Sequence, residues 1–592
     1  MGKIIDEELF MADMCKLMNL MLDRRGYTSE YLKDIENPYH GQLKSIPETV
    51  EYLKFVHDNR LLIVIFPDFD MDGICAGTCD FAGYSELGFN VALYMPDTTK
   101  GYGFDAADID RLIALYPDVA VIMTCDVGIT CYDGITRAKE RGVEVLVTDH
   151  HKEKTYPAGC RRAAYTINPM RIDEKYAHPA ICGAYVSYQL LMAYAEKYGS
   201  ADAREQIRRL LVFAGLGTIS DSMPLLYENR EIVREAINMC RIVYSDGDPF
   251  VVQAIRGCDV YRRAFYGLYQ TFCLLSDMGK LPNGIYSIDE DFFGYYLAPM
   301  FNSVKRMAVD AEHAFGVFFG AEPYKAANYL FDLNEQRKEL VAEHFAKIAG
   351  SISAGTQPFA DAGIYISDAP GGITGLIAQK IMGFTGKPVL VLREEKGAYK
   401  GSGRSPEWYP CYTRCSAMFY IAGHESAFGV GFTDKRELKA FATYLTNDVA
   451  AVMSQLGEEF FKRAGAYYDF VISADGSEDV DIDILAFREF LADMHRLHPF
   501  GKGFEKPKLR LKLNPGDEQT WSVMGSVKQH LKIVMEHGFT VLCWNQAPYV
   551  KLEGHAEPVY IDGYLDMSEY NGSHSINFIG TIAGEGNGDA HE

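Results

Sequence analysis

Three mostly apolar segments, each followed at once by acidic or histidine side chains, constrain the fold of this chain more than any other feature. The segments span residues 61–66, 119–123 and 143–147. Apolar runs of this length predict strands buried on both faces, as in a parallel sheet covered by helices. The side chains that follow are Asp68, Asp70 and Asp72 after the first segment, Asp126 after the second, and Asp149, His150 and His151 after the third. Because ligands gather beyond the carboxyl ends of parallel strands, we expect all seven along one edge of the sheet.

This set of donors predicts a divalent metal site. Carboxylate oxygens and imidazole nitrogens suit Mn²⁺ or Mg²⁺ better than a metal that prefers thiolates. A single acid in a strand-to-helix turn is about as often a simple helix cap as a metal ligand. Capping alone does not explain three such clusters on successive strands, so we predict a metal centre at this edge.

Length and composition are those of a globular protein with several domains. The 592 residues predict three or four domains, and 48% hydrophobic with 23% charged residues is ordinary for a folded chain. A net charge of −23 argues against a general nucleic-acid coat protein, but it is compatible with an enzyme whose basic residues line one groove. The 13 cysteines form no CxxC pair, and no apolar run is long enough to span a membrane. We therefore expect a cytoplasmic protein without structural zinc, disulfides or a membrane anchor.

The order of the patterns predicts a multidomain α/β protein. Strand and helix patterns alternate in the first domain, as in a doubly wound parallel sheet, and short evenly spaced strands near the end are typical of a small barrel. The predicted divisions are an N-terminal helical segment 1–60, a catalytic domain 61–225, a helical region 226–327, a linker helix 328–352, a second α/β domain 353–462, a barrel 465–582 and a disordered tail 583–592. Arg24, Arg25 and the charges of the linker helix are interpreted as solvated helix faces. Trp544 is interpreted first as a core residue and second as a stacking platform for bases.

The acidic clusters carry a resemblance to a known family. Asp70-x-Asp72-Gly73, Asp126-x-Gly128 and Asp149-His150-His151 resemble the first three motifs of the DHH phosphoesterases, and residues 217–225, which include Asp221, resemble the fourth. Within this superfamily the chain is similar, nearly end to end, to the RecJ-like 5′→3′ single-strand DNA exonucleases. Residues 298–307 resemble a further family stretch. There Met300, Ser303 and Lys305 replace an arginine, an alanine and a glycine, and Arg306 is retained on the expected nucleic-acid path.

The second α/β domain resembles the DHHA1 domain, and the barrel resembles the RecJ OB-type domain. Residues 401–405 and 423–424 are similar to DHHA1 motifs that hold substrate phosphates. The resemblance therefore implies phosphate or nucleic-acid binding by Arg306, Ser402, Gly403, Arg404, Ser405 and His424. Gripping the 5′-terminal phosphate in this way would set the direction of degradation.

For the metal centre the resemblance implies two Mn²⁺ or Mg²⁺ ions and no other cofactor. Asp126 would bridge both ions, Asp70 would bind one, and Asp72, His150 and Asp221 would bind the other. Asp149 would orient a histidine, and His151 would contact the scissile phosphate or protonate the leaving oxygen. Asp68 is either a supporting ligand or a turn cap. Some superfamily members have a histidine four residues before the first aspartate, where this chain has Val64 or Phe66, so one ion is expected to be held more weakly.

Three functions remain open on the sequence. The first is a metal-dependent 5′→3′ exonuclease that hydrolyses single-stranded DNA to mononucleotides in DNA repair or recombination, as a monomer working with a single-strand-binding protein or a helicase. The second is a DHH-type phosphodiesterase for short oligoribonucleotides or cyclic dinucleotides. The third is a non-catalytic replication or repair scaffold. The helical insert, linker helix and barrel favour the first, and the retained acids and histidines argue against the third.

Overall fold

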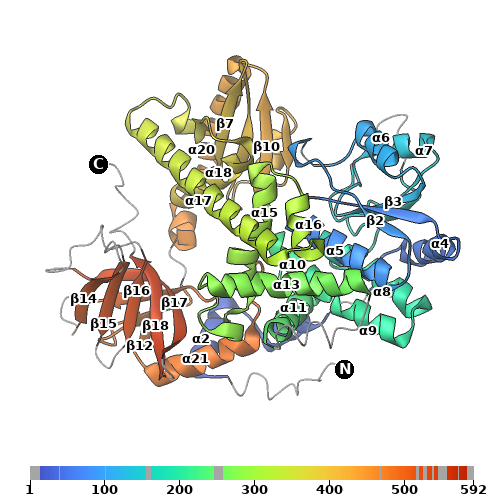
Figure 1. The fold of residues 1–592 in the computed structure, drawn as a ribbon. Coiled ribbons are helices and arrows are strands. Elements are labelled where there is room, and N and C mark those ends of the chain that lie inside the picture. Colours follow the sequence, from blue (N-terminus) through green and yellow to red (C-terminus); the bar gives the residue numbers. More distant parts are fainter. Residues whose placement is uncertain are drawn as a thin grey trace. The chain divides into compact units, whose positions relative to one another are not determined.

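The chain divides into two compact units (Figure 1). The larger comprises Tyr39–Met223 and Glu231–Phe460, and the smaller comprises Met1–Pro38, Pro224–Arg230 and Phe461–Glu592. This computed structural model describes residues 14–38, 41–100, 102–154, 162–245, 258–465, 468–514, 519–524, 530–535, 539–544, 557–570 and 573–582. The predicted disordered tail, 583–592, lies outside the described residues. Among the described helices, none combines the length and the apolar character needed to cross a membrane.

The three predicted apolar strands form the centre of a five-stranded parallel sheet in the larger unit. Its order is β2-β1-β3-β4-β5, with β1 (Leu62–Pro67), β2 (Val91–Leu93), β3 (Val119–Cys125), β4 (Glu144–Thr148) and β5 (Tyr165–Ile167). The predicted α/β class is therefore confirmed. The chain runs from β1 to β2 on one side and then to β3 on the other side. This reversal between β1 and β3 is the place where doubly wound sheets bind ligands at the carboxyl ends of their strands.

Helices cover both faces of this sheet, which explains why its strands are apolar on both sides (Figure 1). Apolar side chains of α6 and α7 share one core with β1, β3 and β4. On the other side α5 packs against α8 and α10, and α4 packs against α8. The helices are α4 (Ile46–Asp58), α5 (Met71–Glu86), α6 (Ala106–Leu115), α7 (Tyr132–Glu140), α8 (Gly183–Tyr198), α9 (Ala201–Arg209) and α10 (Leu211–Ser220).

In its described part, the region predicted to be helical consists of helices joined by short turns. It contains α11 (Tyr227–Ser245), α13 (Asp259–Asp277), α14 (Glu290–Phe292), a π-helical turn (Phe293–Leu297), α15 (Ala298–Met307) and α16 (Glu312–Phe319). The predicted linker helix is α17 (Pro323–Ser353), whose 31 residues span about 46 Å. Helix α15 contacts α5 and α10 of the first domain as well as α17 and α18 (Gly371–Thr385).

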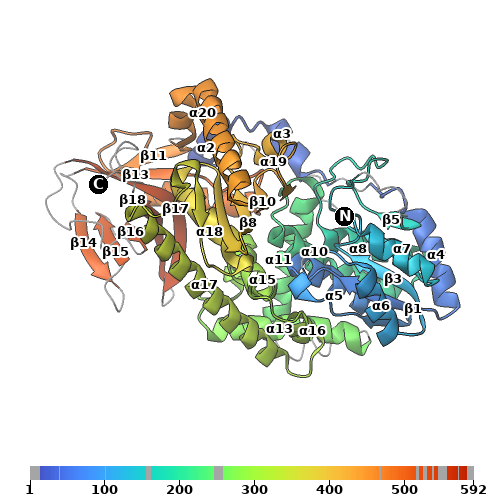
Figure 2. The same cartoon turned by 90° about the horizontal axis from the view of Figure 1, so that it is seen from above.

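The second α/β domain is built on a mixed sheet with the order β6-β7-β8-β10-β9. Its elements are β6 (Ile364–Ile366), β7 (Val389–Glu395), β8 (Ala398–Arg404), α19 (Cys411–Cys415), β9 (Ile421–Gly423), β10 (Ala427–Phe432) and α20 (Lys435–Gly465). Helix α18 lies along β7 and β8 and also contacts α17 (Figure 2). Residues 400–404 thus lie in a strand that faces a helix, and Ser405 follows the strand.

The smaller unit is an eight-stranded mixed sheet that packs against helices from the N-terminal and C-terminal parts of the sequence. Its strand order is β12-β11-β13-β17-β18-β16-β15-β14. The strands are β11 (Phe470–Ser473), β12 (Val480–Asp481), β13 (Leu509–Leu513), β14 (Gln519–Met524), β15 (His530–Met535), β16 (Thr540–Cys543), β17 (Val559–Tyr570) and β18 (Ser573–Ile582). Apolar side chains of α2 (Lys16–Arg25), α3 (Ser29–Glu36) and α21 (Ile484–Leu497) complete the same core. The solvated face expected at Arg25 is wrong, because its guanidinium lies buried against Asp469 with an Nε–Oδ1 distance of 2.7 Å.

Candidate active site

The acidic and histidine side chains predicted as site residues come together at the carboxyl ends of β1, β3 and β4. Their potential ligand atoms form three groups, and within each group all atoms lie within 4.8 Å of one another. The groups are Asp72–His150–Asp221, Asp68–Asp70–Asp126 and Asp126–His150–His151. Asp126 and His150 each belong to two groups, so the three groups form one continuous centre.

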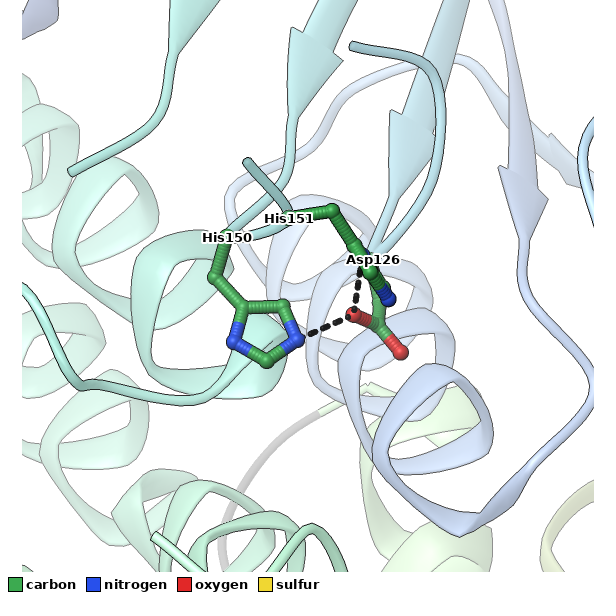
Figure 3. Close-up of side chains that lie close together, drawn as sticks. All are labelled: Asp126, His150 and His151. Carbon is green, nitrogen blue, oxygen red and sulfur yellow. Dashed lines mark ion pairs between the residues drawn. The ribbon is translucent and has the colours of Figure 1, made fainter. Parts of the chain in front are cut away.

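The Asp126 carboxylate lies beside both histidine rings, with ion-pair contacts to each (Figure 3). Its Oδ1 is 3.1 Å from His150 Nε2 and 3.8 Å from His151 Nδ1. The Asp126 backbone has φ of +63°, the left-handed region that a non-glycine residue seldom adopts. A strained conformation at the tip of a buried strand is typical of a residue whose side-chain direction matters for function.

Two glycines leave room for the carboxylates. A Cβ atom on Gly183 would lie 2.4 Å from Asp126 Oδ1, and a Cβ on Gly217 would lie 2.2 Å from Asp72 Oδ1. Both distances are far below van der Waals contact, so any larger residue would displace a carboxylate. Because these two glycines have no side chain, the backbones of α8 and α10 can lie directly against the carboxylates of Asp126 and Asp72.

Asp72 is fixed by the amino end of a helix. Its Oδ2 accepts a hydrogen bond from the Gly183 N–H at 2.7 Å, and its Oδ1 accepts one from the Ala184 N–H at 3.0 Å. These N–H groups belong to the first turn of α8, which has no intrahelical acceptor for them and carries a partial positive charge. The carboxylate remains 3.8 Å from His150 Nε2.

The two histidines are each oriented through the ring nitrogen Nδ1. His150 Nδ1 is 2.8 Å from the Ile181 carbonyl, an acceptor only, so Nδ1 carries the proton and Nε2 offers its lone pair to the centre. His151 Nδ1 is 2.8 Å from Asp149 Oδ1. Asp149 is fully buried and also accepts backbone N–H groups of Ile129, His150 and His151. Burial favours a raised pKa for Asp149, but the hydrogen bond and charge of His151 and these N–H groups hold the pKa below its ordinary value.

The donor set fits divalent cations. Asp68 Oδ2 and Asp126 Oδ1 are buried oxygens with no hydrogen-bond donor among the described residues. Burial raises the pKa of both carboxyl groups, and the neighbouring Asp72 raises the pKa of Asp126 further. Lys305 offsets part of the negative charge at Asp68, and buried carboxylates remain costly unless further positive charge pairs with them. Carboxylate oxygens with an imidazole nitrogen are the ligands that Mn²⁺ and Mg²⁺ take in proteins, so the residues present suit such ions.

Three further residues at the centre were not assigned from the sequence. The Tyr102 hydroxyl is 3.0 Å from His151 Nδ1 and 3.4 Å from Asp149 Oδ2. Asn302 Oδ1 accepts the Met71 N–H at 2.8 Å, which ties α15 to the start of α5. Lys305 Nζ lies 3.1 Å from Asp70 Oδ2. The family-like stretch 298–307 signalled the segment that contains Asn302 and Lys305, but it did not specify their contacts.

The phosphate-binding residues expected in the second α/β domain have different surroundings. The Ser405 hydroxyl is buried and donates to the Tyr409 carbonyl at 2.7 Å, and a Cβ on Gly403 would collide with the Phe428 ring at 2.2 Å. Both therefore have structural tasks within the domain. Ser402 Oγ accepts from Thr374 Oγ1 at 3.0 Å, and His424 is exposed at the turn after β9.

Arg306 and Arg404 belong to a cluster that also contains Arg337 of α17, a residue whose charge the sequence interpretation assigned to a solvated face. Burial and the charge of Arg306 together lower the pKa of Arg404 to about 10. The pKa of Arg337 is lowered by the same two causes. The hydrogen bonds of the three guanidinium groups go to neutral acceptors: the Gly372 carbonyl, the Asn334 amide oxygen and the Gly403 carbonyl. Partly buried guanidinium groups with neutral partners form a strong site for an anion such as phosphate.

In the smaller unit, Trp544 is 49% exposed, so its interpretation as a core residue is wrong. Its ring lies edge-on to the His530 ring at a centroid distance of 4.9 Å. The first residue after β16 thus presents an aromatic surface to solvent, the property needed to stack a base.

Comparisons with known proteins agree with this architecture. The family model for the N-terminal domain of the DHH family matches residues 62–216, and the model for the RecJ OB domain matches residues 479–580. The single-stranded-DNA-specific exonuclease RecJ of Haemophilus influenzae is 24% identical over 530 residues, which cover 85% of this chain and 83% of that protein. Its counterpart in Bacillus subtilis is 24% identical over 546 residues, but this chain spans only 61% of that protein.

The fold is shared with solved structures. The crystal structure of Thermus thermophilus RecJ with Mn²⁺ has a TM-score of 0.69 at 21% identity and covers 97% of this chain and 76% of that chain. The Mg²⁺ complex of the same protein has a TM-score of 0.65. The two family models and the length of the matches lead to one conclusion. The chain carries a DHH-family N-terminal domain and a RecJ OB domain, and over most of its length it is similar to RecJ exonucleases.

Proposed function

We propose that this protein is a divalent-metal-dependent exonuclease that hydrolyses single-stranded DNA from the 5′ end to mononucleotides. The observation that carries the proposal is the continuous centre in which Asp126 belongs both to an Asp68–Asp70 group and, with His150, to a second group. Two ions sharing one carboxylate are the arrangement used for in-line displacement at phosphodiesters. The relatives named above are exonucleases specific for single-stranded DNA, which supports the choice of substrate.

Each residue of the centre has a proposed role in metal binding or in contact with the substrate. Asp68, Asp70 and Asp126 would hold one Mn²⁺ or Mg²⁺, and Asp72, His150 and Asp221 would hold the other together with Asp126. When bound, such ions neutralise phosphate charge and lower the pKa of water. Asp149 holds the His151 ring through Nδ1, which leaves Nε2 to contact the scissile phosphate or pass a proton to the leaving oxygen. The Tyr102 hydroxyl limits the movement of the same ring.

Direction would come from the arginine cluster. Arg306, Arg337 and Arg404 offer charged donors whose protein partners are neutral, so a terminal phosphate would be the first anion to pair with them. Ser402 lies on the same strand as Arg404 and can supply one further donor. A 5′-terminal phosphate held there would present its first phosphodiester to the metal centre.

Further aspects of the proposal concern the cellular setting. Twelve described cysteines are free thiols, as expected for a protein of the cytoplasm. We propose that the enzyme acts there as a monomer and receives its single strands from a helicase or a single-strand-binding protein. Size-exclusion chromatography with light scattering tests the first point, and pull-down with those purified partners tests the second.

The test of the function uses single-stranded DNA and RNA labelled at either end, with Mn²⁺, Mg²⁺ or EDTA. We expect labelled mononucleotide to appear at once from 5′-labelled DNA and to disappear when EDTA removes the metal. Cleavage confined to very short RNA would assign the protein to the oligonucleotide phosphodiesterases. Absence of any turnover would favour a scaffold.

Two aspartate variants make this assay specific. Asp126→Ala removes the carboxylate shared by two ligand groups and should reduce kcat at least about 10³-fold, the scale of losing a central catalytic group. Asp118→Ala is the matched control, because Asp118 is exposed and precedes the same strand, β3, at its other end. Equal activity of the two variants would contradict the assignment of the centre.

A further inference from the structure

Lys305 places a positive charge directly on one of the three ligand groups. Its Nζ is 3.1 Å from Asp70 Oδ2 and 3.6 Å from Asp68 Oδ2, and it lies 5.1 Å from the centroid of the Phe69 ring. The lysine side chain is one-third exposed, and Asp68 is buried. One ammonium group therefore donates to Asp70 and lies close to Asp68.

The position of this lysine is set by the fold. Three residues earlier on the same helix, Asn302 accepts the Met71 N–H and donates to Ser220 Oγ, which fixes α15 against α5 and α10. Residues three apart share one face of a helix, so Lys305 points to the same place as Asn302. The family stretch that residues 298–307 resemble has a glycine where this chain has Lys305, so the charge is a departure of this chain from that pattern.

The ligand group that contains Asp70 lies next to a lysine ammonium, and the group that contains Asp72 pairs with a histidine instead. Asp68, Asp70 and Asp126 form the group that faces Lys305. Asp72, His150 and Asp221 form a group whose described ion-pair contacts are to the histidine ring, which is neutral when it binds a metal. A divalent ion shared by Asp68 and Asp70 would compete with the ammonium for Asp70 Oδ2, which already accepts its hydrogen bond, and like charges so close together repel strongly.

We propose that Lys305 is a built-in cation that occupies the Asp68–Asp70 pair, so that the centre binds one divalent ion tightly and the second only when Lys305 is displaced. The tight ion belongs to Asp72, His150 and Asp221, and the weak ion belongs to Asp68, Asp70 and Asp126. This inference rests on the proposed metal-dependent function and adds an order of binding to it. It also gives a cause for a weak second ion that differs from the lack of a histidine at Val64 or Phe66.

Mn²⁺ binding to the full-length protein without nucleic acid tests the proposal. Electron paramagnetic resonance counts free Mn²⁺ during a titration, and calorimetry gives the affinities. We expect one tight site and a second site at least about 10-fold weaker in the wild type. In Lys305→Met, which keeps the length of the side chain and removes its charge, the second site should tighten at least about 10-fold.

Lys54→Met is the control for the loss of one positive charge. Lys54 lies on α4, pairs with Asp58 one turn later and touches none of the ligand groups, so both affinities should stay as in the wild type. If Lys305→Met does not fold, as judged by circular dichroism, Lys305→Gln is measured instead.

Two equal sites in the wild type, or an unchanged second site after the Lys305 substitutions, would overturn the proposal while leaving the metal centre intact. The second of these results would assign the weakness to the missing histidine. Absence of any Mn²⁺ binding would instead contradict the proposed function itself.

Discussion

Replacing Gly183 by alanine perturbs the centre strongly without replacing any of the ligand residues. The new Cβ would lie 2.4 Å from Asp126 Oδ1, about 1 Å short of ordinary contact, so the carboxylate must move by about that distance. A misplacement of 1 Å at reacting groups costs about 10²-fold in rate. The Gly183 N–H that binds Asp72 is retained, so the change acts through Asp126.

The same change also affects stability. Overpacking costs about 1–3 kcal/mol, and replacing glycine in a helix returns up to about 1 kcal/mol. We therefore expect kcat on 5′-labelled single-stranded DNA to fall about 100-fold and Mn²⁺ affinity to fall with it. Urea unfolding should show a loss of stability of at most about 3 kcal/mol, so that the variant is folded when kcat is measured.

Gly350→Ala is the matched control, since Gly350 is exposed on α17 and no atom of the described residues lies within 4 Å of the place its new methyl group would take. This variant should gain about 0.5–1 kcal/mol of stability and keep its kcat. Wild-type kcat and Mn²⁺ affinity in Gly183→Ala would refute the view that the glycine defines the position of Asp126.

Three further predictions concern stability, phosphate binding and the barrel. Burial raises the pKa of Asp80 to about 7 from 3.8, so the stability that Asp80 contributes below about pH 4 is lost as pH rises to 7, by at most about 1.4 kcal/mol per pH unit. In urea unfolding between pH 4 and 8, the free energy of unfolding of the wild type should fall relative to that of Asp80→Asn. The same pH dependence in both proteins would contradict this prediction. Arg404→Gln should raise KM for 5′-phosphorylated strands about 10- to 100-fold, whereas Arg208→Gln, which breaks an exposed pair with Glu205, should not. Trp544→Ala should weaken single-strand binding by about 1–3 kcal/mol in fluorescence anisotropy without changing the unfolding midpoint, and an equal loss of stability would return Trp544 to the core.

Local pattern was sufficient to predict most of the secondary structure. The predicted linker helix 328–352 lies within α17 (Pro323–Ser353). The strands before the acidic motifs were equally clear, because residues buried on both faces leave a continuous apolar run. Trp544 shows where this reasoning fails: a tryptophan next to a strand is apolar in sequence, but the sheet leaves it half exposed.

The candidate site was predictable for its ligands and not for what surrounds them. Asp70, Asp126 and His150 stand in motifs at the ends of predicted strands, so their proximity follows from the parallel sheet. The Ile181 carbonyl that orients His150 comes from a loop without such a motif. Arg337, on a helix that looked uniformly solvated, proved to be partly buried near Arg306.

By itself, the sequence determined the elements, the parallel sheet and the acidic edge, because each depends on the burial period and chemistry of neighbouring residues. Only the tertiary structure decided that Arg25 pairs with Asp469, 444 residues away, and that α2 and α3 share a core with the barrel strands while α4 packs against α8. It also decided that Lys305 meets Asp68 and Asp70. Contacts of this kind arise when whole helices and strands pack against one another, so they cannot be predicted from the periodicity of apolar residues within one element.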